Sequence, residues 1–172
     1  MALDRTLDFL RYNQWANTTL LKACAKCSPE QWVQPLPGSF PTLRHLWLHI
    51  HDAQYLWFQR IQGRSFSAFP SHSMSETEQT RAAEHVLESG RAFLDHFANV
   101  ESDYWDTTIV YKNTRGAAFS QTAGEIVQHV CNHGTYHRGQ IVQGLRTLFP
   151  AEKVPATDYI WFCREKANNS GT

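Results

Sequence analysis

This 172-residue sequence lacks an excess of charge of either sign, a long apolar run and a clear cysteine framework. Lysine plus arginine equals aspartate plus glutamate, at 16 each, and no basic run is present. The electrostatic footprint of a nucleic-acid-binding protein is therefore missing. No apolar run is long enough to cross a bilayer, and the first residues lack the basic and then apolar layout of a signal peptide. We expect a cytoplasmic protein without nucleic-acid or membrane partners.

The four cysteines give no sign of a disulfide or metal-binding framework. Cys24 and Cys27 form a C-x-x-C pair, but no second pair with the spacing of zinc ligands accompanies it. Because free cysteine commonly packs as a small core residue, we interpret this pair as structural. The apolar fraction of 42% is enough for one domain with a sizeable core, which we expect to span residues 1–172.

Apolar residues recur at helical spacing in four long segments, and capping patterns mark where several helices begin. Capping boxes, in which a serine or threonine precedes a glutamate or glutamine by three residues, begin at Ser28, Ser73, Ser75 and Thr122. The first of these predicts only a short helical turn. We expect long helices over residues 2–25, 41 or 42 to 63, 73 or 75 to 99, and 122–149, and a short terminal helix over 158–166.

A β-hairpin is expected between the third and the fourth long helix. Residues 106–112 are rich in β-branched and aromatic side chains, a turn follows at 113–116, and residues 117–120 complete the pattern. The sequence therefore favours an all-α fold, a four-helix bundle with a small β-hairpin inserted before the last long helix. The aromatic residues that we expect in the bundle core are Trp15, Trp47 and Trp57.

Histidines recur every fourth residue in the last long helix. His129, His133 and His137 share one face, since positions four apart in an α-helix lie roughly 6 Å apart along the axis. His133 and His137 also occupy positions of the apolar stripe that faces the bundle. Burying two imidazoles is costly unless a partner satisfies them, and a divalent metal such as zinc, nickel or iron would do so. The alternative is that these histidines are hydrogen-bonded core or surface residues, and for His129 a structural or supporting role is favoured over ligation.

One helix alone does not supply three ligands. His129 and His137 are about 12 Å apart along the axis, whereas each ligand nitrogen must lie about 2.0–2.1 Å from a zinc ion. A third ligand should therefore come from another helix, and the second long helix offers His45, His49 and His51. His49 adjoins the apolar stripe of that helix, while the other two lie further round. Spacing alone favours His49 over His51 and leaves both open.

Together these residues resemble the DinB/YfiT-like family of small bacterial four-helix-bundle metal proteins. The parts that carry the likeness are the segment Tyr12–Asn17, His49 with Trp57 and Gly63, the loop Leu36–Thr42, and the segment His129–Ile141. The likeness covers essentially the whole chain. It implies a divalent site formed by His49, His133 and His137, nickel or zinc as the metal, and a homodimer. It also implies transferase or isomerase chemistry that depends on a bacterial low-molecular-weight thiol.

Three histidine ligands would leave at least one coordination position open, which is typical of catalytic zinc sites. In H-E-x-x-H metalloproteases a glutamate follows the first histidine and acts as base, but Gly134 stands at that position. The Glu-x-x-His pairs of di-iron bundles are also missing. Because a bound metal favours the thiolate form of a thiol, we expect a metal-dependent transferase in which a cofactor thiol attacks a small electrophile.

Two alternatives stay open. One is a hydrolase that uses metal-bound hydroxide, with Asp52 or Glu125 as a possible base, although capping or surface roles are expected for both acids. The other is a non-enzymatic metal-binding stress protein, in which the site only stabilises the bundle. A fourth protein ligand that closes the coordination sphere would favour the second alternative, whereas an open position beside a pocket would favour an enzyme.

Overall fold

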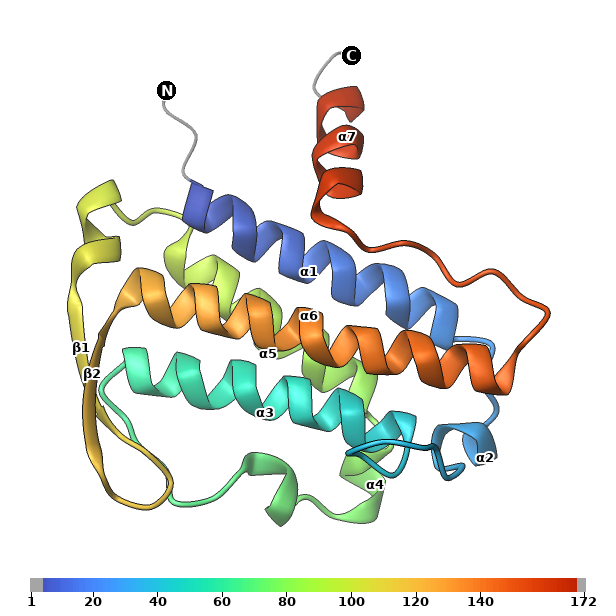
Figure 1. The fold of residues 1–172 in the computed structure, drawn as a ribbon. Coiled ribbons are helices and arrows are strands. Elements are labelled where there is room, and N and C mark those ends of the chain that lie inside the picture. Colours follow the sequence, from blue (N-terminus) through green and yellow to red (C-terminus); the bar gives the residue numbers. More distant parts are fainter. Residues whose placement is uncertain (1–4, 170–172) are drawn as a thin grey trace.

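Four long helices lie side by side in the computed structural model, which describes residues 5–169 (Figure 1). They are α1 (Arg5–Cys24), α3 (Leu43–Ile61), α5 (Ala82–Phe97) and α6 (Ala123–Leu148). Both α1 and α3 pack against α5 and α6, so the helices form the four corners of a bundle. This confirms the predicted four-helix bundle. The expected start of the first helix at residue 2 lies outside the described residues.

Shorter elements connect the long helices or follow the last of them. These are α2 (Pro29–Trp32), the 3-10 helix η1 (Pro70–Ser73), α4 (Glu76–Gln79), the 3-10 helix η2 (Ser102–Asp106) and the terminal helix α7 (Tyr159–Asn169). The chain returns from the end of α6 along α1 before α7 begins, and the Tyr12 hydroxyl of α1 donates to the Thr157 carbonyl oxygen at 2.9 Å (Figure 1). Within residues 5–169, every helix is too short or too polar to cross a bilayer.

Capping residues set the helix starts much as the sequence predicts. In the boxes at Ser28, Ser75 and Thr122, the hydroxyl oxygen accepts from the backbone N–H three residues later, and that residue's side chain accepts from the N–H of the capping residue. Thr42 caps α3 through its hydroxyl oxygen. Gly63 follows the end of α3 with a φ of 77°, in the left-handed region that favours glycine.

The predicted third helix is wrong in one respect, because it is broken in two. α4 ends at Gln79 and α5 begins at Ala82, and Arg81 between them departs from helical geometry with φ −89° and ψ 21°. The Thr80 hydroxyl donates to the Thr77 carbonyl oxygen at 2.6 Å. Such local side-chain bonds compete with the helical pattern, which accounts for a break without proline or glycine.

The predicted hairpin is present as an antiparallel pair of strands. It consists of β1 (Thr108–Lys112) and β2 (Ala118–Thr122), with Thr108 opposite Thr122. The first strand begins later than predicted because Asp106 still belongs to η2. Since Thr122 is also the N-terminal cap of α6, the hairpin holds the start of the helix that carries three of the histidines.

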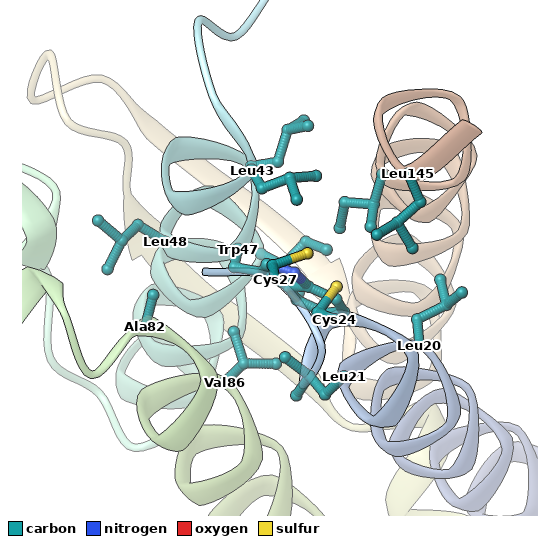
Figure 2. Packing of buried hydrophobic residues seen from close by; sticks show 13 residues of the cluster. Leu20, Leu21, Cys24, Cys27, Leu43, Trp47, Leu48, Ala82, Val86 and Leu145 are labelled. Atoms are coloured by element: carbon teal, nitrogen blue, oxygen red, sulfur yellow. The ribbon is translucent and has the colours of Figure 1, made fainter. Parts of the chain in front are cut away.

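Apolar side chains fill the bundle in two main clusters, one toward each end. The first cluster surrounds Trp47, which has no exposed surface, and includes Cys24 and Cys27 (Figure 2). Both cysteines are buried and free, and burial raises the pKa of the Cys24 thiol to about 12. The interpretation of this pair as structural core residues is therefore consistent with their environment.

Trp15 and Trp57 are only half-buried, so the expectation of a core position is wrong for both. Trp15 packs against the terminal helix, where its Nε1 donates to the Glu165 carboxylate at 2.8 Å. The Trp57 ring lies 4.4 Å from the Arg60 guanidinium and 5.0 Å from the Tyr111 ring of the hairpin. Each indole therefore packs between the bundle and an outer element, an environment that suits its amphipathic character.

A buried polar network crosses the bundle between the two apolar clusters. Gln54 of α3 accepts at Oε1 from the side-chain amides of Asn13 and Asn17 in α1, and its Nε2 donates to the Val86 carbonyl oxygen of α5. The side-chain oxygens of Asn13 and Asn17 accept in turn from Nη1 of Arg138 in α6. The network joins all four long helices and favours one register among them.

Candidate metal site

Three histidines from two helices meet where α3 packs against α6. One ring nitrogen from each of His49, His133 and His137 lies within 4.8 Å of the other two. The ring centroids are 4.8 Å apart for His49 and His133, 4.5 Å for His49 and His137, and 4.4 Å for His133 and His137. Within residues 5–169, this is the group of histidine, cysteine and acidic side chains whose spacing could hold a metal ion.

The positions of individual nitrogens fit a shared ion. Nε2 of His49 lies 3.0 Å from Nε2 of His133. Two nitrogens bound to one tetrahedral zinc lie roughly 3.3 Å apart, so a small adjustment of the rings would admit the ion. His137 donates from Nδ1 to the Gln140 side-chain oxygen at 2.8 Å, which leaves its Nε2 lone pair free to ligate.

The ring nitrogen of His133 that faces away from His49 has no partner among residues 5–169. Nδ1 of His133 is buried and has no hydrogen-bond partner within the described part of the chain. A buried polar atom without a partner costs about 1–3 kcal/mol. An ion bound at Nε2 would not satisfy this Nδ1 atom, so the fit to a zinc-like or nickel-like ion rests on the donor set of three neutral imidazoles.

Burial keeps the three imidazoles neutral. It lowers the pKa of His49 to about 4 and that of His133 to about 3, and in both the neighbouring His137 lowers it further. The pKa of His137 is also lowered by burial, although its hydrogen bond with Gln140 acts in the opposite direction. At neutral pH all three rings are therefore in the form that can ligate a metal.

The structure separates the other candidate histidines from this group. His51 points toward α5, where its Nδ1 donates to the His85 carbonyl oxygen at 3.0 Å. His45 is exposed and contacts the Thr42 hydroxyl. His129 is exposed, with its ring 5.1 Å from the Trp57 ring and 5.9 Å from the His133 ring. Of the histidines in α3, the structure thus brings His49, and not His51, to the pair in α6.

Aromatic side chains that the sequence did not single out flank the three histidines. The Phe40 ring lies 4.5 Å from the His49 ring and 5.3 Å from the His137 ring, and the Phe69 ring lies 6.3 Å from the His49 ring. Both phenylalanines come from loops, whose approach to the helices has no periodic signal in the sequence. Gln140 could have been found, because it lies one helical turn after His137.

A pocket of about 450 Å³ opens beside His49. Its walls come from α3, from the loop before it and from the segment around η1. The lining residues are Phe40, His45, Leu48, His49, Asp52, Phe69, Ser71, His72 and Gln79. A ligand in this pocket would therefore lie next to one of the three candidate metal ligands.

The two acids considered as bases have structural partners. Asp52 accepts from the Ser71 N–H at 2.9 Å and from the Ser71 hydroxyl at 2.5 Å, which ties η1 to α3. Burial raises the pKa of the Asp52 carboxyl, while the bonds from Ser71 lower it. Glu125 is exposed and belongs to the Thr122 capping box. The expected capping role of Glu125 is confirmed, whereas the expectation is wrong for Asp52, which is neither a cap nor a surface residue but a buried carboxylate bonded to Ser71.

Gly134, which stands where a metalloprotease has its glutamate, has a packing role. A Cβ atom at this position would lie 2.7 Å from Asn13 Oδ1 and 2.8 Å from Arg138 Nη1. Because glycine has no Cβ atom, the Arg138 side chain can turn back along α6 at this position and reach α1. The requirement for glycine here explains why this helix has no room for the protease base.

Comparisons with known proteins agree with this architecture. A protein of Bacillus subtilis (strain 168) named Protein DinB is 26% identical over 148 residues, which cover 83% of this chain and 86% of the relative. The uncharacterized protein YizA from the same organism is 22% identical over 151 residues, covering 83% of this chain and 87% of the relative. The crystal structure of a DinB-like protein from Bacillus cereus ATCC 10987 shares the fold, with a TM-score of 0.63 at 18% identity, covering 86% of this chain and 94% of that one.

The family assignment rests on the extent of the sequence match. The profile of the DinB family matches residues 2–169, which is nearly the whole chain and includes the three helices that carry the resemblance seen in the sequence. The chain therefore belongs to the DinB family.

Proposed function

We propose that this protein binds one divalent metal ion through His49, His133 and His137 and uses it to transfer a thiol to a small electrophile. The observation that carries the proposal is the convergence of three neutral ring nitrogens, within 4.8 Å of one another, from two helices. Zinc or nickel suits this donor set, and such an ion supplies Lewis acidity that favours the thiolate form of a thiol. The thiol proton passes to solvent, the thiolate sulfur forms a bond to carbon of the electrophile, and the leaving group on that carbon departs to solvent with the electron pair of the broken bond.

The surrounding side chains would prepare the site for this chemistry. Gln140 orients the His137 ring by accepting from its Nδ1. Phe40 covers His49 and His137 on one side and limits the access of water. The pocket next to His49 leaves room for a second reactant on the remaining side.

As a homodimer is common among proteins that this chain resembles, we include self-association in the proposal, to be measured by light scattering.

The two competing functions make different demands on the same residues. A hydrolase needs a free base, but Asp52, the carboxylate in the pocket, accepts two hydrogen bonds from Ser71. A purely structural metal site should be closed by a fourth ligand, and within residues 5–169 no further histidine, cysteine or acid joins the three histidines. Both observations favour the transferase.

Metal analysis of purified variants tests the proposal. His49→Ala, His133→Ala and His137→Ala should each lose stoichiometric zinc or nickel, because two protein ligands remain. His51→Ala is the matched control from α3 and should keep wild-type metal content. His129→Ala should weaken binding by no more than about 10–100-fold, the effect of a supporting residue. If His133→Ala and His137→Ala both keep full metal, the site is wrong.

Thiol chemistry is tested separately on the metal-loaded protein. Several bacterial low-molecular-weight thiols are offered with a small electrophile, and thioether formation is compared between metal-loaded and metal-free protein. Metal-dependent conjugation with one of these thiols is expected. Metal binding without conjugation by any thiol would contradict the transferase function but not the proposed metal site.

A further inference from the structure

The pocket beside His49 has a composition that selects among ligands. Phe40 and Phe69 form two aromatic walls, and the buried Leu48 forms an aliphatic one. At about 450 Å³, the pocket has the size of sites that bind small organic molecules. An apolar ring placed between the two phenylalanines would bury its faces against aromatic surface and would lie next to the candidate metal ligands.

The side chains that line the pocket do not favour an anion. None of its nine lining residues is lysine or arginine. The lining carboxylate, Asp52, accepts from both the N–H and the hydroxyl of Ser71, so these donors are already used. His45 and His72 lie at the exposed edge. In the metal-free protein, a carboxylate or phosphate entering the pocket would lose water, gain no lysine or arginine partner and meet the Asp52 carboxyl.

We propose that this pocket binds the electrophile, and that the electrophile is a small, uncharged molecule with an aromatic or apolar ring rather than a carboxylate or a phosphate ester. This inference rests on the proposed function for the role of the ligand as electrophile. The pocket itself is formed by protein side chains alone, so its preference can be measured with and without metal.

Two matched thioethers, which resemble the product of such a transfer, serve as probes. Benzyl methyl sulfide is uncharged, and 4-(methylthiomethyl)benzoate carries the same group with a carboxylate on the ring. Dissociation constants are measured by NMR titration at neutral pH, on metal-free and on zinc-loaded protein. The uncharged probe should bind the metal-free protein at least about 10-fold more tightly than the carboxylate probe does, a difference of about 1.4 kcal/mol.

Three variants locate the binding. Phe69→Ala should raise the dissociation constant of the uncharged probe by about 10-fold, since the substitution removes one wall of the pocket. Phe66→Ala is the matched control, because Phe66 lies in the same loop but lines a different hollow, and it should bind as the wild type does. Gln79→Lys adds a cation at the pocket and should improve binding of the carboxylate probe by at least about 3-fold.

Each other outcome overturns the inference. It is wrong if the carboxylate probe binds the metal-free protein as tightly as the uncharged one, if neither probe binds, or if Phe66→Ala and Phe69→Ala lose affinity equally. Failure of the metal proposal would show differently, as a wild-type protein that takes up no zinc or nickel. The metal-free titration would then still decide the preference of the pocket.

Discussion

The Arg138 guanidinium donates to the Asn17 side-chain oxygen at 2.9 Å in the centre of the bundle. Arg138 is 1% exposed, and its other acceptors are the Asn13 side-chain oxygen at 2.7 Å and the Thr135 hydroxyl at 2.8 Å. Burial lowers the pKa of this arginine, and within residues 5–169 no carboxylate forms an ion pair with it. A buried positive charge is thus held by neutral oxygens and by the Tyr12 ring, 5.5 Å away.

This arrangement predicts that removing an acceptor is worse than removing the charge. Asn17→Leu leaves the Arg138 charge buried with one acceptor fewer, and should lower the free energy of unfolding by about 3–5 kcal/mol. Arg138→Met leaves two amide oxygens without a donor but also removes the desolvation penalty of the buried charge, so the net loss should be about 1–3 kcal/mol. Urea denaturation of both variants shows which of them loses more free energy of unfolding. A larger loss for Arg138→Met would show that the charge is not the dominant cost.

Two glycines of α6 should respond to alanine in opposite ways. Gly134→Ala places a methyl group within 3 Å of Asn13 and Arg138 and should destabilise the protein by about 1–3 kcal/mol. Gly139→Ala meets no atom within 4 Å, so its higher helix propensity should stabilise the protein by about 0.5–1 kcal/mol. Thermal unfolding of the pair measures both effects. A stabilised Gly134→Ala variant would mean that the polar network tolerates displacement.

The parts of the fold that follow from local chemistry were predictable. The capping boxes at Ser75 and Thr122 depend only on neighbouring residues, and so does the four-residue spacing that puts His133 and His137 on one face. The structure contains each of these features. The break between α4 and α5 was not predictable in this way. Nothing near Thr80 is a strong helix breaker, and the break depends on a weak local competition for hydrogen bonds.

The choice between His49 and His51 shows why the rest needed more than local pattern. His49 adjoins the apolar stripe of α3 and His51 lies further round, so spacing favours His49 without deciding the choice. Which side of the stripe faces α6 depends on where the other helices pack. The structure places α5 on the side of His51 and α6 on the side of His49. Likewise, the sequence alone would predict a surface position for Arg138, because its acceptors lie on a different helix, α1.

The tryptophans of the bundle should differ in their contribution to stability. Trp47 is fully buried, and Trp47→Ala should lower the free energy of unfolding by about 3–5 kcal/mol. Trp15 is half-buried beneath α7, so Trp15→Ala should cost only about 1–2 kcal/mol. Chemical denaturation compares the two variants directly. Equal losses would place Trp15 in the core and contradict its position in the structure.

The metal-free protein should lose stability as the pH falls below the ordinary histidine range. The folded-state pKa values of His49 and His133, about 4 and about 3, lie below the unfolded value of 6.5. Each ring therefore binds protons more readily in the unfolded chain, so its contribution to stability is complete above 6.5 and is lost as the pH falls toward the folded values. Burial of Asp52 acts in the opposite direction, because its pKa is raised in the fold.

The measurement is the free energy of unfolding in the presence of a chelator, at about pH 7.5 and about pH 5. The wild type should be less stable at the lower pH. His133→Gln lacks the imidazole with the lowest of these pKa values and should show a smaller loss over the same range. His72→Gln, which replaces an exposed histidine, is the control and should follow the wild type. If His133→Gln loses as much stability as the wild type, burial of this imidazole is not what couples folding to pH.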